Sequence, residues 1–101
     1  MGKKYFFLRL NPVRADFVQT MTDEEKGIMM RHSMHWREFQ LKGKIVVFGP
    51  VVDPAGAFGM GVAAVDSEEE LKGFIAGDPA LVLSTIDYFP MKAVLPDSKY
   101  P

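Results

Sequence analysis

Two helix-start signals of the same type divide this chain of 101 residues into segments of definite structure. Thr22 opens the run Thr-Asp-Glu-Glu, and Ser67 opens Ser-Glu-Glu-Glu. In such a capping box the hydroxyl accepts a hydrogen bond from the amide of the glutamate, and the glutamate reaches back to the capping residue. We therefore predict one helix from Thr22 to about Lys42, with Gly43 as its left-handed cap, and a second helix that starts at Ser67 and ends just before Gly77.

The segments around these helices have the composition of strands. They are rich in β-branched and aromatic residues, and turn residues such as Asn11-Pro12 separate them. The predicted strands are residues 3–10, 44–52, 57–65 and 84–94. Pro90 cannot donate to a strand ladder, so it favours an edge or a bulge for the last strand. Residues 11–21 have no clear period and are predicted to form a loop, and residues 80–83 a short helical turn.

The resulting order, β-α-β-β-α-β, is the plan of the ferredoxin-like α+β fold. We expect two interlocked βαβ units in one antiparallel sheet, with both helices on one face. A chain of this length forms one domain, residues 1–101, with its core at about 3–95 and an irregular tail at 96–101.

The first strand is apolar on both of its faces. Tyr5 and Phe7 alternate with Phe6 and Leu8, whereas a sheet with one face in water normally alternates polar and apolar residues. Two helices cover only one face, so the other face would leave an extended apolar patch exposed. We expect a second copy of the chain, related by a two-fold axis, to cover that patch as a homodimer.

The charge balance excludes several classes of partner. Twelve basic and thirteen acidic side chains give a net charge of −1 with the signs interspersed, whereas a nucleic-acid-binding protein normally shows a basic excess. The longest apolar stretches fall far short of the roughly 20 residues that span a bilayer, so no membrane contact is expected. With no cysteine and no signal-peptide pattern, we expect a cytoplasmic protein.

Residues 30–50, MRHSMHWREFQLKGKIVVFGP, place two histidines and a tryptophan on the first predicted helix before a strand that ends in Gly-Pro. This spacing resembles that of the YciI-like (YCII-related) family, within the dimeric α+β barrel superfamily. The matching positions are His32, Trp36, Phe39, Gly43 and Gly49-Pro50, followed by the acidic SEEEL, Asp78-Pro79 and IDYFPMK. The chain departs from the family pattern at Lys42, where an acidic residue is frequent, and at Ser33, where an apolar residue is usual.

The resemblance implies a homodimer with one small pocket per subunit. We expect the loop 11–21, the histidine helix and the Gly-Pro end of the strand to border this pocket. It also implies cofactor-free proton transfer of the lyase, isomerase or dehydrochlorinase type on a small, cyclic or anionic substrate. In that chemistry His32 is the general acid or base, and Asp78 sets its charge or orientation. The residues expected to bind the substrate are Arg9, Trp36, Gly49 and Pro50.

Each of the polar candidates also has a structural alternative. His32 is suited to moving protons near neutral pH, or it lies at the margin of the core and bonds a backbone carbonyl. Asp78 orients the histidine across the pocket, or it caps the turn before Pro79. Arg9 binds an anionic substrate, or it pairs with an acidic neighbour such as Asp87.

Two further motifs are weaker than they look. His32 and His35 have the spacing of a metal-binding pair, but zinc needs a third protein ligand and the chain has no cysteine, so no metal is expected. Residues 59–64, GMGVAA, match a loose dinucleotide-binding pattern. That pattern works only in a turn between a strand and a helix, and here it lies inside a predicted strand, so no cofactor is expected.

Three functions fit these observations: an enzyme of the kind just described, a non-catalytic ligand-binding or regulatory dimer with the same pocket, and a structural dimer without a ligand. The accessibility of His32 discriminates between them. Catalysis requires His32 to be accessible from a cavity. Ligand binding alone does not require this, and a structural role would leave His32 buried without access.

Overall fold

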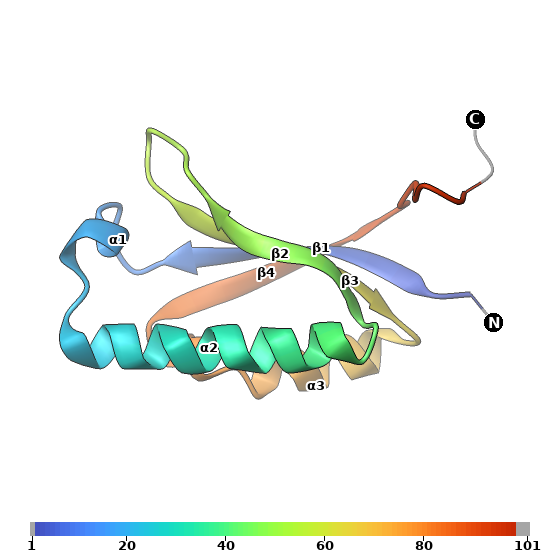
Figure 1. The fold of residues 1–101 in the computed structure, drawn as a ribbon, viewed down its shortest axis with the longest axis horizontal. Helices are drawn as coiled ribbons and strands as arrows, with labels where there is room; N and C mark the ends of the chain where they lie inside the picture. The colour runs from blue at the N-terminus through green and yellow to red at the C-terminus, as the bar shows by residue number, and fades with distance from the viewer. Residues whose placement is uncertain (1, 99–101) are drawn as a thin grey trace.

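The computed structural model describes residues 2–98 and has the predicted order of elements (Figure 1). The elements are β1 (Lys4–Pro12), α1 (Phe17–Thr20), α2 (Asp23–Leu41), β2 (Ile45–Val51), β3 (Phe58–Val65), α3 (Glu68–Ala76), the 3-10 helix η1 (Pro79–Val82) and β4 (Ser84–Met91). The ferredoxin-like α+β fold is therefore confirmed.

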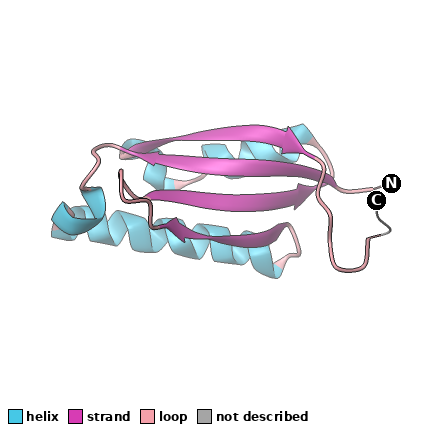
Figure 2. Ribbon diagram, turned by 90° about the horizontal axis from the view of Figure 1, so that it is seen from above, coloured by secondary structure: helices cyan, strands magenta, loops and turns pink. Residues whose placement is uncertain are grey.

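The four strands form one antiparallel sheet in the order β2-β3-β1-β4. The helices α2 and α3 lie on the same side of it, so the opposite face of the sheet is uncovered in a single chain (Figure 2). Pro90 lies in the edge strand β4, opposite Phe6 of β1, as its missing amide hydrogen predicts.

Both predicted helix starts are confirmed. The Thr22 hydroxyl accepts from the Glu25 amide at 3.1 Å, and the Glu25 carboxylate accepts from the Thr22 amide at 2.9 Å. Ser67 accepts from the Glu70 amide at 3.1 Å. Gly43 follows α2 with a φ of 80°, the left-handed conformation that favours glycine.

Residues 11–21 are more ordered than the predicted loop. The strand β1 continues to Pro12, which pairs with Ser84 of β4, and residues 17–20 form the one-turn helix α1. Phe17 explains the helix, because its side chain is only 5% exposed and anchors the turn against the domain. Both features depend on distant partners, which the local sequence pattern does not contain.

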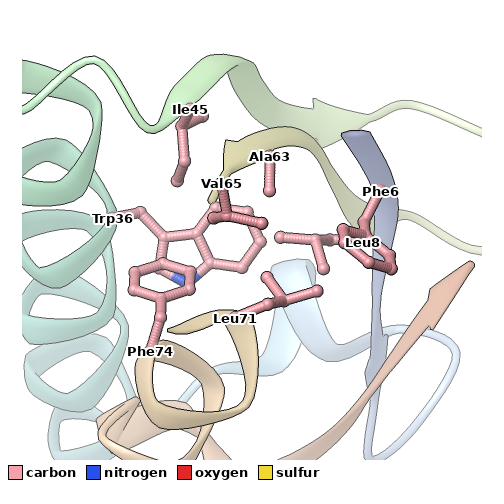
Figure 3. Close-up of a cluster of buried hydrophobic side chains, with 8 residues drawn as sticks. All are labelled: Phe6, Leu8, Trp36, Ile45, Ala63, Val65, Leu71 and Phe74. Carbon is pink, nitrogen blue, oxygen red and sulfur yellow. The ribbon is translucent and has the colours of Figure 1, made fainter. Parts of the chain in front are cut away.

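The core lies between the sheet and the helices α2 and α3 (Figure 3). Its buried members come from every strand except β4 and from both long helices: Phe6, Leu8, Trp36, Ile45, Ala63, Val65, Leu71 and Phe74. The indole of Trp36 lies against Gly61 of β3 so closely that a Cβ atom at that position would overlap its ring. Close packing against Trp36 therefore explains the glycine at this position of the strand.

The outer face of the sheet carries Val47, Phe89 and Met91, which are 49%, 50% and 38% exposed. These positions alternate along the strands with residues that face the helices. None of the helices within residues 2–98 combines the length and the apolar character needed to cross a membrane.

Candidate functional site

A cavity of about 300 Å³ is lined by residues of α1, the middle of α2 and the facing ends of β2 and β3. Its walls are mainly apolar. Large apolar residues that line it are Leu10, Phe17, Met29, Trp36 and Phe48, and the polar ones are His32 and Ser33. The volume is at the lower end of the range for small-molecule sites.

His32 connects this cavity to a buried carboxylate. Its Nδ1 lies 2.9 Å from Oδ1 and 2.8 Å from Oδ2 of Asp78. Asp78 is only 4% exposed and does not line the cavity, so it stands behind the imidazole ring. The two residues are 46 positions apart in the chain. Helix α2 carries the histidine, and the turn after α3 brings the aspartate to it.

The second ring nitrogen of His32 remains free for chemistry. Within residues 2–98, Nε2 makes no hydrogen bond, yet no buried side-chain nitrogen or oxygen there lacks a partner. Nε2 is therefore an accessible atom, and the cavity that His32 lines gives it that access. The alternative role for His32, a hydrogen bond to a backbone carbonyl, is not found, because its Nδ1 is bonded to the Asp78 carboxylate.

Asp78 is held by three donors. Oδ2 also accepts from the indole Nε1 of Trp36 at 2.5 Å, and Oδ1 accepts from the Ala80 amide at 2.8 Å. Burial raises the pKa of the Asp78 carboxyl, but the hydrogen bonds from His32, Ala80 and Trp36 together hold it below its ordinary value. Asp78 is thus a carboxylate that both caps the turn before Pro79 and contacts the histidine, so its two alternative roles are combined.

This arrangement determines which nitrogen of His32 carries a proton. An ionised carboxylate accepts hydrogen bonds only, so Nδ1 must donate to Asp78. In the neutral imidazole, Nε2 then presents its lone pair to the cavity. The geometry is that of a base whose orientation is set by a buried carboxylate.

Three of the four predicted substrate-binding residues surround the same cavity: Trp36, Gly49 and Pro50. Arg9 does not line it. Alternation along β1 puts Arg9 on the outer face, where its guanidinium lies 3.7 Å from the ring centroid of Phe58. Its Nε donates to Asn11 at 2.9 Å, and Asn11 in turn donates to Asp87 at 2.8 Å. The predicted neighbour Asp87 is thus reached through Asn11.

His35, one turn beyond His32, is a packing residue. Its ring is stacked on Phe74 with centroids 4.7 Å apart, and its Nε2 donates to the Phe74 carbonyl at 2.7 Å. Across residues 2–98, no three His, Cys, Asp or Glu side chains come together as a metal site would require.

Residues 11–21 contribute to the cavity wall as expected, but several wall residues were not named individually from the sequence. Phe17 and Val18 belong to the short helix α1, and the only signal for them was an apolar pair inside the predicted loop. Met29 lies one turn before Ser33 on α2, and methionine there was indistinguishable from ordinary core filling. Ser33 appeared only as a departure from the family pattern.

The fold resembles that of a solved enzyme, although no family model and no curated protein matches the chain. That solved enzyme is 5-chloro-2-hydroxyhydroquinone dehydrochlorinase (TftG) from Burkholderia phenoliruptrix AC1100, in complex with 2,5-dihydroxybenzoquinone. The match has a TM-score of 0.57 and 19% sequence identity, and it covers 86% of this chain and 93% of that one. Similarity at this identity shows a shared fold.

Proposed function

We propose that the protein is a small-molecule enzyme that catalyses proton transfer without a cofactor, with His32 as the general acid or base. One observation carries the proposal: Nδ1 of His32 is held by a buried carboxylate, while Nε2 has no hydrogen-bond partner within residues 2–98 and the residue lines an apolar cavity. Fold similarity to a dehydrochlorinase supports the reaction class. The resemblance of residues 30–50 to the YciI-like family points in the same direction, and membership of that family is part of the proposal.

The chemistry follows from the two ends of the imidazole ring. Nε2 removes a proton from an acidic C–H or O–H group of the substrate, and Asp78 stabilises the imidazolium that results. In an isomerisation, Nε2 returns the proton to another atom of the substrate. In an elimination, the electrons of the broken C–H bond form a new double bond, the leaving group departs with its electron pair, and His32 releases the proton to water. Asp78 acts through His32, so it is a positioning residue.

The apolar wall supplies the binding surface. Trp36, Gly49 and Pro50 border the space in which the substrate would lie against Nε2. Arg9 is on the opposite face of the sheet, so the proposal gives it no contact with a substrate in the same subunit.

The test measures turnover on a panel of chlorinated hydroquinones and unsaturated cyclic lactones. Chloride release and deuterium incorporation from D₂O, followed by NMR, detect elimination and proton transfer without knowledge of the natural substrate. We expect His32→Gln to lower the rate by about 10²–10⁴-fold, the usual contribution of a general acid or base. His35→Gln, which changes the other histidine of the same helix, should retain the rate.

Two results would contradict the enzymatic proposal. Equal turnover in parent and His32→Gln would remove His32 from the mechanism. Saturable binding of the panel without turnover would favour the alternative, a ligand-binding or regulatory dimer that uses the same cavity.

We also propose that a second copy of the chain covers the outer face of the sheet. The exposed side chains of Val47, Phe89 and Met91 support this, because a monomer would leave them in water together. Sedimentation equilibrium at micromolar concentration should give a dimer mass. Phe89→Glu should shift it towards a monomer, whereas Leu81→Glu in η1, which is 40% exposed, should not. A monomer mass for the parent would contradict the proposal.

A further inference from the structure

The cavity has an unusual charge environment for a site that is expected to handle anions. Within residues 2–98, no lysine, arginine, aspartate or glutamate lines it. The nearest candidate on α1's side, Arg14, is occupied: its guanidinium bonds Glu25 at 2.8 Å and Thr20 at 2.8 Å. Arg9 lies over Phe58 on the outer face of the sheet. An anionic ligand would therefore enter the cavity without a free cation to meet it.

The His32–Asp78 pair does not supply that cation. With a neutral imidazole the pair carries one negative charge, and with an imidazolium it is neutral overall, since Asp78 is ionised. Neither state attracts an anion, and removing a carboxylate or phosphate from water without a compensating partner is costly. The charges around the cavity therefore favour an uncharged ligand.

Ser33 provides a second polar contact next to the first. It directly follows His32 on α2 and lines the same cavity. Ser33 is exposed at the surface of α2, and it also lines a neighbouring hollow with Arg37 and Glu38. Its hydroxyl makes no side-chain hydrogen bond within residues 2–98, so it can bind a ligand at the edge of the cavity. A hydroxyl both donates and accepts, so it can bind either kind of ligand oxygen.

We propose that the site takes an uncharged, single-ring compound with two oxygen functions, one bonded to Nε2 of His32 and the other to the Ser33 hydroxyl. This inference rests on the proposed function, because it uses the same cavity and the same Nε2. The small volume and the apolar walls select the ring, and the two adjacent polar groups orient it. Ser33 is the specificity-determining residue in this assignment.

Trp36 makes a direct binding test possible. It is the only tryptophan of the chain and it lines the cavity, so its fluorescence reports on ligands there. The probes are phenol, catechol, resorcinol and benzoate, titrated at pH 8 with excitation above the absorption of the phenols. We expect saturable quenching by the uncharged probes in the millimolar range, with at least one dihydroxybenzene tighter than phenol. Benzoate should bind at least about tenfold more weakly than phenol.

The variant Ser33→Ala separates the role of serine from the rest of the site. The variant should bind the tighter dihydroxybenzene about three- to tenfold more weakly, because one neutral hydrogen bond is lost. Its affinity for that compound should then equal its affinity for phenol. Phenol, which has one oxygen, serves as the internal control and should bind the variant and the parent equally.

Three results would overturn the inference. Benzoate binding as tightly as phenol would refute the charge argument, and unchanged affinities in Ser33→Ala would remove serine from the site. Absence of saturable quenching by every phenol in the millimolar range would refute the ligand class. Because binding is measured without turnover, an inactive protein that binds the dihydroxybenzene through Ser33 would support this inference while contradicting the enzymatic proposal.

Discussion

The space between the sheet and its helices has two halves that serve different purposes. In the half under α3, side chains pack without a gap: the rings of Phe39 and Phe74 are stacked with centroids 4.1 Å apart, and Leu71 is completely buried. In the half beside α1, the cavity remains open between apolar walls. Trp36 lies between the two halves, since it contacts Phe74 on one side and lines the cavity on the other.

The difference follows from what covers each half. Helix α3 has 9 residues and presents Leu71 and Phe74 to the core. The cover of the other half, α1, has 4 residues, of which only Phe17 is buried. One turn of helix cannot fill the space that a longer helix fills. The two histidines of α2 follow this division: His35 packs on Phe74, and His32 faces the cavity.

Removing a side chain from each half should give the largest contrast. Leu71→Ala leaves a hole in a fully packed region, and we expect the free energy of unfolding to fall by about 2–5 kcal/mol. Met29→Ala removes a side chain that already borders open space, so it should cost less than about 1 kcal/mol. Urea denaturation measures both. Equal losses would mean that the two halves are packed alike.

Adding a methyl group tests the same contrast in the opposite direction. A Cβ at Gly61 would overlap the buried indole of Trp36, so Gly61→Ala should destabilise the protein by about 1–3 kcal/mol. A Cβ at Gly49, which pairs with Met60 on the outer face of the sheet, would meet nothing within 4 Å, and Gly49→Ala should change stability by less than about 0.5 kcal/mol. A large loss at Gly49 in thermal or urea unfolding would contradict the contrast between the packed inner face and the open outer face at these two glycines.

Substituting either histidine should lower the free energy of unfolding by a similar amount, but the two substitutions should differ in their effect on function. His32→Ala removes a donor from buried Asp78, and His35→Ala leaves the Phe74 carbonyl without its donor, so each should cost about 1–2 kcal/mol in urea unfolding. Only His32→Ala should abolish turnover and weaken phenol binding. Loss of binding in both variants would indicate a general structural effect.

The smallest effect concerns the segment before α1, where the Arg14 guanidinium donates to the Glu25 carboxylate of α2. Hydrogen bonds from Arg14, and then from the Thr22 amide, lower the pKa of Glu25 to about 2. An unfolded carboxyl has a pKa of about 4.3, so the stabilisation by ionised Glu25 is complete above that pH and is lost as the pH falls through the folded value.

Glu25→Gln isolates this contribution, because glutamine can still accept from the Thr22 amide as a capping-box residue. The difference in urea midpoint between parent and variant should be constant near neutral pH and should shrink below about pH 4. Glu24→Gln, at the exposed neighbouring position, should show no such dependence. A difference that persists unchanged in acid would contradict the role of the Arg14–Glu25 pair.

The contacts that make the site join distant parts of the chain. From the sequence alone, a turn cap was the favoured role of Asp78, because it needs only Ala80 two residues away. Its contact with His32 requires the turn after α3 to be placed against α2, and no local pattern encodes that placement. The cavity, likewise, exists because α1 is too short to fill the space, and α1 itself forms around Phe17 only when the domain is assembled.

By itself, the sequence determined the helix starts, the order of the strands along the chain and the restriction of Pro90 to an edge or a bulge, because these depend on hydrogen bonds and dihedral preferences within a few residues. Only the tertiary structure decided which face of β1 meets the helices. Both faces are apolar, so alternation could not tell whether Arg9 would lie beside the cavity or on the outer face. Packing against Trp36 and Leu71 chose Phe6 and Leu8 for the core, and that choice placed Arg9 on the other side of the sheet from His32.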